Sequence, residues 1–156
     1  MEHITICICT YKRPVLLKRL LNSILQLETG NLFTYSVVIV DNDISHSAKK
    51  IIEVVKINSE IKLEYYSVHE KNIALARNTT LVNSKGDYCA FIDDDEFPVT
   101  NWLLLHYKTI KSYNATAVLG PVIPYYENDP PNWLKKSKLC DRERFTTGTS
   151  LHWKNT

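Results

Sequence analysis

The regular alternation of strand-like and helix-like segments constrains the fold of this chain more than any other feature of its sequence. Short apolar, β-branched runs are each followed by a stretch whose apolar residues recur at helical spacing. We expect strands at 4–9, 35–40, 61–68, 88–92 and 115–122, and helices from 14, at 47–57, from 72 and from 98. This alternation predicts an α/β domain with a Rossmann-like, mostly parallel sheet flanked by helices.

Local signals support these boundaries. Pro14 suits the first turn of a helix, and Gly30 ends the helical pattern that begins at Pro14. Asn72 can cap a later helix. Four consecutive β-branched residues at 37–40 are typical of a parallel strand that is buried on both faces. Beyond Pro121 the sequence becomes rich in proline and polar residues. We therefore expect residues 1–122 to form the α/β core and residues 123–156 to form a further segment of the same domain.

Bulk properties exclude several classes of protein. A chain of 156 residues suits one domain with a real core. A net charge of +2 and the lack of an arginine-rich stripe argue against nucleic acid as a partner. No apolar run approaches the roughly 20 residues that span a bilayer. The first residues lack the basic region of a signal peptide, so a cytoplasmic location is expected.

The four cysteines do not suggest a disulfide framework. Cys7 and Cys9 are two residues apart, which in a strand gives them one face and a Cα separation of about 6.6 Å, a poor disulfide geometry. Cys89 and Cys140 each stand alone. We expect buried, reduced thiols, with a zinc site as a remote alternative.

Polar residues gather at the ends of three expected strands. Thr10–Arg13 follows the first, Asp41–Asp43 follows the second, and the acidic run Asp93–Glu96 follows the fourth. In parallel sheets, ligands bind beyond the carboxyl ends of the strands. The sequence therefore predicts a functional site at this edge of the sheet.

The acidic run carries the most specific chemistry. Alternate residues of an extended segment share a face, so Asp93 and Asp95 form the natural pair and Asp94 turns aside. Neighbouring carboxylates repel each other unless a cation compensates them, and Mg²⁺ and Mn²⁺ prefer oxygen ligands and commonly bridge carboxylates to phosphates. A metal–diphosphate site is the favoured interpretation, and a solvated acidic loop is the alternative.

Two further residues have open interpretations. Asp41 could accept a hydrogen bond from a nucleobase or ribose, or it could be a turn or capping residue. Arg77 could pair with a diphosphate or with a carboxylate of the site, or it could be an ordinary surface arginine. The spacing of other residues excludes further classes of protein. The four glycines form neither a dinucleotide-binding motif nor a P-loop, and no nucleophile-elbow motif of a hydrolase occurs.

Taken in order, these segments resemble the nucleotide-binding half of a GT-A glycosyltransferase of family 2, of the exopolysaccharide-biosynthesis type. The resemblance spans essentially the whole chain. The segment Asn72–Asn78 departs from the family pattern, because the family glycine is replaced and the spacing is shorter. The matching segments are Cys9-Thr10-Tyr11-Lys12-Arg13-Pro14, Val40-Asp41-Asn42, the DxD-like Asp93-Asp94-Asp95, Trp102-Leu103, Leu119-Gly120-Pro121-Val122, Pro130-Pro131-Asn132-Trp133 and Thr147-Gly148.

The resemblance implies a role for each matching position. Asp41 would accept from the uracil N3–H, and Arg77 would contact the base or the diphosphate. Asp95 would ligate Mn²⁺ or Mg²⁺, and Asp93 would hold the ribose or belong to the metal shell. The nucleotide-binding residues would be Thr10, Tyr11, Arg13, Asp41, Arg77, Asp93 and Asp94.

The implied function is metal-dependent transfer of a sugar, with inversion, from a UDP-sugar to a glycan or lipid-linked acceptor in surface polysaccharide biosynthesis. Residues 123–156 would begin the acceptor side, and peripheral association with the inner face of the membrane is left open. The catalytic base is expected beyond Thr156, so the C-terminal part of the fold would be incomplete. The alternatives are a truncated, non-catalytic nucleotide-sugar-binding module and, less favoured, a nucleotidyltransferase.

Overall fold

The computed structural model describes residues 1–137 and 139–149. The chain divides into two compact units, Met1–Leu104 and Leu105–Thr156. The first unit contains the sheet and is described first.

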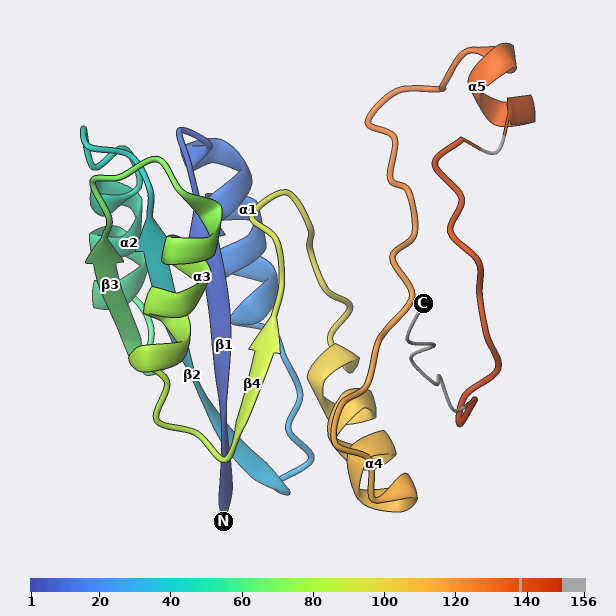
Figure 1. Cartoon of the computed structure of the whole chain (residues 1–156), viewed down its shortest axis with the longest axis horizontal. Coiled ribbons are helices and arrows are strands. Elements are labelled where there is room, and N and C mark those ends of the chain that lie inside the picture. The colour runs from blue at the N-terminus through green and yellow to red at the C-terminus, as the bar shows by residue number, and fades with distance from the viewer. Residues whose placement is uncertain (138, 150–156) are drawn as a thin grey trace. The chain divides into compact units, whose positions relative to one another are not determined.

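The first unit is built on a parallel sheet with the strand order β3-β2-β1-β4 (Figure 1). All three strand pairs are parallel. The strands are β1 (Glu2–Thr10), β2 (Phe33–Asp41), β3 (Leu63–Ser67) and β4 (Tyr88–Phe91). The prediction of a mostly parallel, Rossmann-like α/β sheet is confirmed.

Three helices connect these strands: α1 (Pro14–Ile24), α2 (Lys49–Ile57) and α3 (Ile73–Val82). The chain moves outward from β1 to β3 through α1 and α2, which contact each other on one face of the sheet. It then returns across the sheet through α3 to reach β4. Right-handed crossovers place such a returning helix on the opposite face, where α3 packs over β1 and β2 (Figure 1).

The two central strands form the core because helices cover both of their faces. Consecutive side chains of β2, from Val37 to Val40, are all buried, as the β-branched run predicts. Leu17, Leu20 and Leu21 of α1 are buried as well. The apolar residues that the sequence pattern marks in α1 and in β2 are therefore buried in one common core.

Local signals fix two helix starts. Pro14 is in the first turn of α1. The side chain of Asn72 accepts hydrogen bonds from the backbone N–H groups of Ala74 and Leu75, at 3.0 and 3.1 Å, and so caps α3. The expected cap is confirmed, and it fixes the first turn of the helix that carries Arg77.

The second unit differs from its prediction. The helix expected from residue 98 is α4 (Trp102–Tyr113), and a short α5 (Asn132–Ser137) follows. The strand expected at 115–122 is wrong, because these residues are irregular. A strand needs a hydrogen-bonded neighbour, and the described residues of this unit contain helices but no strand for it to pair with.

The cysteines follow their prediction in part. Cys7 is buried and Cys9 is half-buried, and burial raises the pKa of both thiols, that of Cys9 to about 11. Cys89 and Cys140 are exposed, so the expectation of burial is wrong for these two. Among the described residues, no helix is long and apolar enough to cross a membrane.

Candidate functional site

The carboxyl ends of β1 and β2 and the segment after β4 meet at one edge of the sheet. Strand register brings Thr10 beside Asp41, and Cys7 beside Phe91, two residues before the acidic run. A cavity of about 500 Å³ opens there. Its lining residues are Cys9, Thr10, Tyr11, Arg13, Asn42, Lys71, Ile73, Arg77, Asp93, Asp94 and Asp95. Six of the seven residues predicted to bind nucleotide lie in this lining, together with Asp95.

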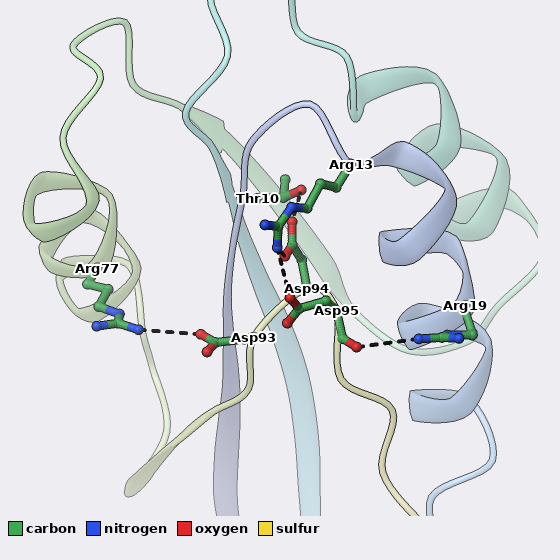
Figure 2. Close-up of polar contacts among 7 residues, drawn as sticks. All are labelled: Thr10, Arg13, Arg19, Arg77, Asp93, Asp94 and Asp95. Atoms are coloured by element: carbon green, nitrogen blue, oxygen red, sulfur yellow. Dashed lines mark hydrogen bonds and ion pairs between the residues drawn. The ribbon is translucent and has the colours of Figure 1, made fainter. Parts of the chain in front are cut away.

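Asp94 is the buried member of the acidic run, with only 5% of its surface exposed. Its carboxylate accepts a hydrogen bond from the Thr10 hydroxyl at 2.8 Å and from Arg13 Nη1 at 3.1 Å (Figure 2). A buried carboxylate needs such partners to offset its lost hydration. Asp94 thus ties the segment after β4 to the end of β1.

Arg13 contacts two carboxylates through one nitrogen. Its Nη1 also donates to Asp95 Oδ2 at 2.9 Å (Figure 2). Half of the Asp95 side chain is exposed. The charge of Asp94, more than that of Asp95, raises the pKa of Arg13. The Asp95 backbone carbonyl accepts from Arg19 Nη2 at 3.4 Å, and the Arg19 guanidinium lies 4.4 Å from the centre of the Phe97 ring.

Asp93 faces a different arginine. Arg77 Nη2 of α3 lies 3.4 Å from Asp93 Oδ1 (Figure 2). Both side chains are more than half exposed. The alternation predicted for this run is therefore present in its exposure, with Asp93 and Asp95 outward and Asp94 inward. That Asp93 and Asp95 share one cation stays a prediction.

Asp41 does not line the cavity. It has no exposed surface, and its carboxylate accepts from the backbone N–H groups of Asp43 and Ala48, each at 3.0 Å, and from the Tyr65 hydroxyl at 3.2 Å. Burial, and then the charge of Asp41, raises the pKa of Tyr65. The structure shows the turn role for Asp41, whose carboxylate also holds the residue before α2, but α2 has no side-chain cap. Contact of Asp41 with a base stays a prediction.

Asn42 is a cavity residue that the sequence did not single out. Its side-chain amide donates to the backbone carbonyls of Val68 and Glu70, and its oxygen accepts from the backbone N–H of Asn72 at 3.1 Å. It therefore holds the loop between β3 and α3 against the end of β2. In the sequence, Asn42 belongs to the polar run after the second expected strand and to the matching segment Val40-Asp41-Asn42, but neither signal gave it a role.

The same loop brings Lys71 to Tyr11. The Lys71 ammonium lies 5.0 Å from the centre of the Tyr11 ring, and that of Lys12 lies 5.4 Å away. Both distances are within cation–π range. Sequence reasoning missed Lys71, Ile73 and Cys9, because they are distant in the chain and gather only when the sheet forms.

The donor chemistry of this edge suits a hard divalent cation. Asp93 and Asp95 expose carboxylate oxygens to the cavity, and Mg²⁺ and Mn²⁺ prefer oxygen ligands. Within the described residues, no three His, Cys, Asp or Glu side chains are grouped to hold a metal ion by themselves. A cation here would therefore complete its coordination with water or phosphate oxygens, as Mg²⁺ commonly does.

The fold and the position of the site define a class. The described structure is similar to that of the S. aureus TarS fragment 1–349 in complex with UDP-GlcNAc, with a TM-score of 0.67 at 20% identity over 86% of this chain and 38% of that one. It is also similar to the mannosyltransferase PcManGT from Pyrobaculum calidifontis in complex with GDP-Man and Mn²⁺, with a TM-score of 0.62 at 19% identity over 70% and 32% of the two chains. The first unit therefore has the GT-A fold.

Sequence comparison gives the family. The chain belongs to the family described as Glycosyl transferase family 2, which matches residues 5–155. It is 36% identical over 133 residues to the succinoglycan biosynthesis protein ExoM of Rhizobium meliloti (strain 1021), covering 85% of this chain and 43% of that protein. It is 28% identical over 130 residues to the glycosyltransferase GlyA of Streptococcus pneumoniae serotype 4, covering 82% and 18%. The chain thus spans less than half the length of these curated relatives.

Proposed function

We propose that this chain supplies the donor-binding part of a glycosyltransferase that moves a sugar from a UDP-sugar to a glycan or lipid-linked acceptor during surface polysaccharide biosynthesis. Family membership supports sugar transfer, and the relationship to ExoM supports a polysaccharide product. The observation that carries the proposal is the cavity at the carboxyl edge of the sheet, where two arginines and three aspartates converge.

The cavity offers separate surfaces for the parts of a nucleotide sugar. The guanidinium groups of Arg13 and Arg77 can each donate two parallel hydrogen bonds to diphosphate oxygens. The Tyr11 ring is partly exposed beside Lys71 and offers a stacking surface for a base. Uracil is the proposed base, and the bound UDP-GlcNAc of TarS supports that choice.

Asp93 and Asp95 would hold Mn²⁺ or Mg²⁺, and this cation would stabilise the negative charge on the leaving diphosphate as the glycosidic bond breaks. The Mn²⁺ bound with GDP-Man in PcManGT supports a divalent cation for this fold. Asp94 holds Arg13 at the rim of the cavity, and Asn42 holds the loop that presents Lys71. These residues bind and orient the donor.

Inversion requires a base that deprotonates the acceptor hydroxyl, and we assign none of the described carboxylates to that role. The family members to which the chain is similar are longer, and we propose that the base lies in the region that corresponds to their additional length. Binding of the donor without turnover is the competing function for this chain alone. We place the reaction on the cytoplasmic side of the membrane, where a peripheral position would bring the chain to a lipid-linked acceptor.

A nucleotide panel tests the proposal. The melting temperature should rise with UDP and Mn²⁺ together, and less with either alone. Strong stabilisation by CTP or UTP without an effect of UDP would instead support a nucleotidyltransferase, and a preference for GDP would reject uracil. Stabilisation by UDP-sugar without its hydrolysis or transfer would support the binding-only function.

A further inference from the structure

We propose that Arg13 is an internal counter-ion that Asp95 exchanges for the divalent cation, so that the cation and the nucleotide diphosphate bind with positive coupling. This inference rests on the proposed function and adds a positioning role for Arg13. The observation behind it is that one guanidinium nitrogen is hydrogen-bonded to two carboxylates that differ in burial (Figure 2).

The two carboxylates hold Arg13 with different strength. Asp94 is almost fully buried and also accepts from Thr10, so its position is fixed. Asp95 and Arg13 are both about half exposed, and such ion pairs contribute little because water screens them. Arg13 can therefore leave Asp95 at small cost while Asp94 retains it.

The Arg13–Asp95 contact competes with a cation. Arg13 Nη1 is 2.9 Å from Asp95 Oδ2, which is an oxygen that a metal would need. A guanidinium and a divalent cation at one carboxylate oxygen repel each other, so the cation must displace Arg13. Without nucleotide, this displacement lowers the affinity for the cation.

A diphosphate removes that cost. When Arg13 turns away from Asp95, Asp94 still holds it at the cavity, and its freed N–H groups can donate to a diphosphate oxygen. Cation and nucleotide then each favour the arrangement that the other needs. Because coupling is reciprocal, Mn²⁺ should raise the affinity for UDP by the same factor by which UDP raises the affinity for Mn²⁺.

The test is Mn²⁺ binding followed by electron paramagnetic resonance, with and without saturating UDP, for the wild-type chain and Arg13→Gln. We expect the substitution to raise the affinity of the nucleotide-free protein for Mn²⁺ about two- to fivefold, the range for one exposed ion pair. The enhancement of Mn²⁺ binding by UDP should fall by a similar factor. Arg13→Lys keeps the charge but loses the planar donor group, so its enhancement of Mn²⁺ binding by UDP should lie between those of the wild-type and Arg13→Gln proteins. It replaces Arg13→Gln in the test if that variant does not fold.

Lys18→Gln is the matched control. It removes one positive charge from an exposed residue of α1 close to Arg13 in the chain, and Lys18 does not line the cavity. Loss of charge alone should change the affinity for Mn²⁺ equally with and without UDP, and so leave the enhancement unchanged. An unaltered enhancement in Arg13→Gln would overturn the exchange while the proposed function stood. Failure of every protein to bind Mn²⁺, even with UDP, would overturn both.

Discussion

Three consecutive aspartates of identical chemistry occupy three different environments in this protein. Asp94 is buried against Thr10, while Asp93 and Asp95 are exposed to two different arginines. These surroundings separate their roles: Asp94 anchors the segment after β4, and Asp93 and Asp95 expose the carboxylates that we propose bind a cation. A side chain that is exposed and paired only with an arginine can change partner without disturbing the core.

Asp95→Asn should abolish Mn²⁺-dependent binding of UDP and leave the fold intact. The substitution keeps the shape but removes the charge that a divalent cation needs, and an exposed ion pair contributes only about 0–1 kcal/mol to stability. Isothermal titration calorimetry with and without Mn²⁺ measures the affinity, and thermal unfolding checks the fold. Unchanged Mn²⁺-dependent affinity would remove Asp95 from the metal site.

Asp41→Ala should destabilise the protein by at least about 1–3 kcal/mol, because it leaves buried donors of Asp43, Ala48 and Tyr65 without an acceptor. Tyr65→Phe removes one of these donors and should cost about 1 kcal/mol. Urea denaturation measures the free energy of unfolding of both variants. A loss of UDP affinity in Asp41→Ala, with inorganic diphosphate unaffected and stability unchanged, would instead indicate that Asp41 reads the base.

Among the elements, the loop between β3 and α3 is held at the carboxyl edge of the sheet by side-chain hydrogen bonds. Asn42 at the end of β2 holds the loop before α3, and Asn72 within that loop caps α3. The strands and the cap could be predicted from β-branched runs and from one asparagine before a helical pattern. The contacts of Asn42 and Lys71 could not, because they depend on which strands become neighbours in the sheet.

Asn42→Ala should lower the affinity for UDP more than Asn72→Ala does. Loss of Asn42 frees both ends of the loop that carries Lys71, whereas loss of Asn72 removes a helix cap worth about 1 kcal/mol. Asn42→Asp separates the two kinds of contact, because it keeps the oxygen that accepts from the Asn72 backbone N–H but cannot donate to the carbonyls of Val68 and Glu70. Equal affinity in the wild-type and Asn42→Ala proteins would show that the loop is held by other contacts.

The edge strand β3 provides a prediction on pH. Hydrogen bonds from Lys62 and then Tyr66 lower the pKa of Glu64 from 4.5 to about 2. Because the folded pKa lies below the unfolded one, the stabilisation is present above pH 4.5 and is lost as the pH falls toward 2. Glu64→Gln should therefore flatten the fall in unfolding free energy over this window, as measured by urea denaturation at a series of pH values. An identical slope in the variant would contradict the assigned cause.

At the scale of the whole molecule, the two units differ in how well the sequence predicts them. The first unit follows from local patterns, because alternating strands and helices of a parallel sheet bury one another. The second unit does not, since the apolar residues at 115–122 look like a strand in the sequence, whereas the described residues of this unit contain no strand that could pair with them. The residues that line the cavity all belong to the first unit, and most of them lie in segments that the sequence singled out, whereas their binding roles stay predictions.

Backbone amide chemical shifts, recorded as the protein is titrated with UDP and Mg²⁺, test directly whether the cavity at the carboxyl edge of the sheet binds a nucleotide diphosphate together with a divalent cation. We expect saturable shifts concentrated at Thr10–Arg13, at Arg77 and at Asp93–Asp95, and these shifts should become larger when both ligands are present. Shifts centred outside the cavity, or none at ligand concentrations that saturate a related glycosyltransferase, would contradict this expectation.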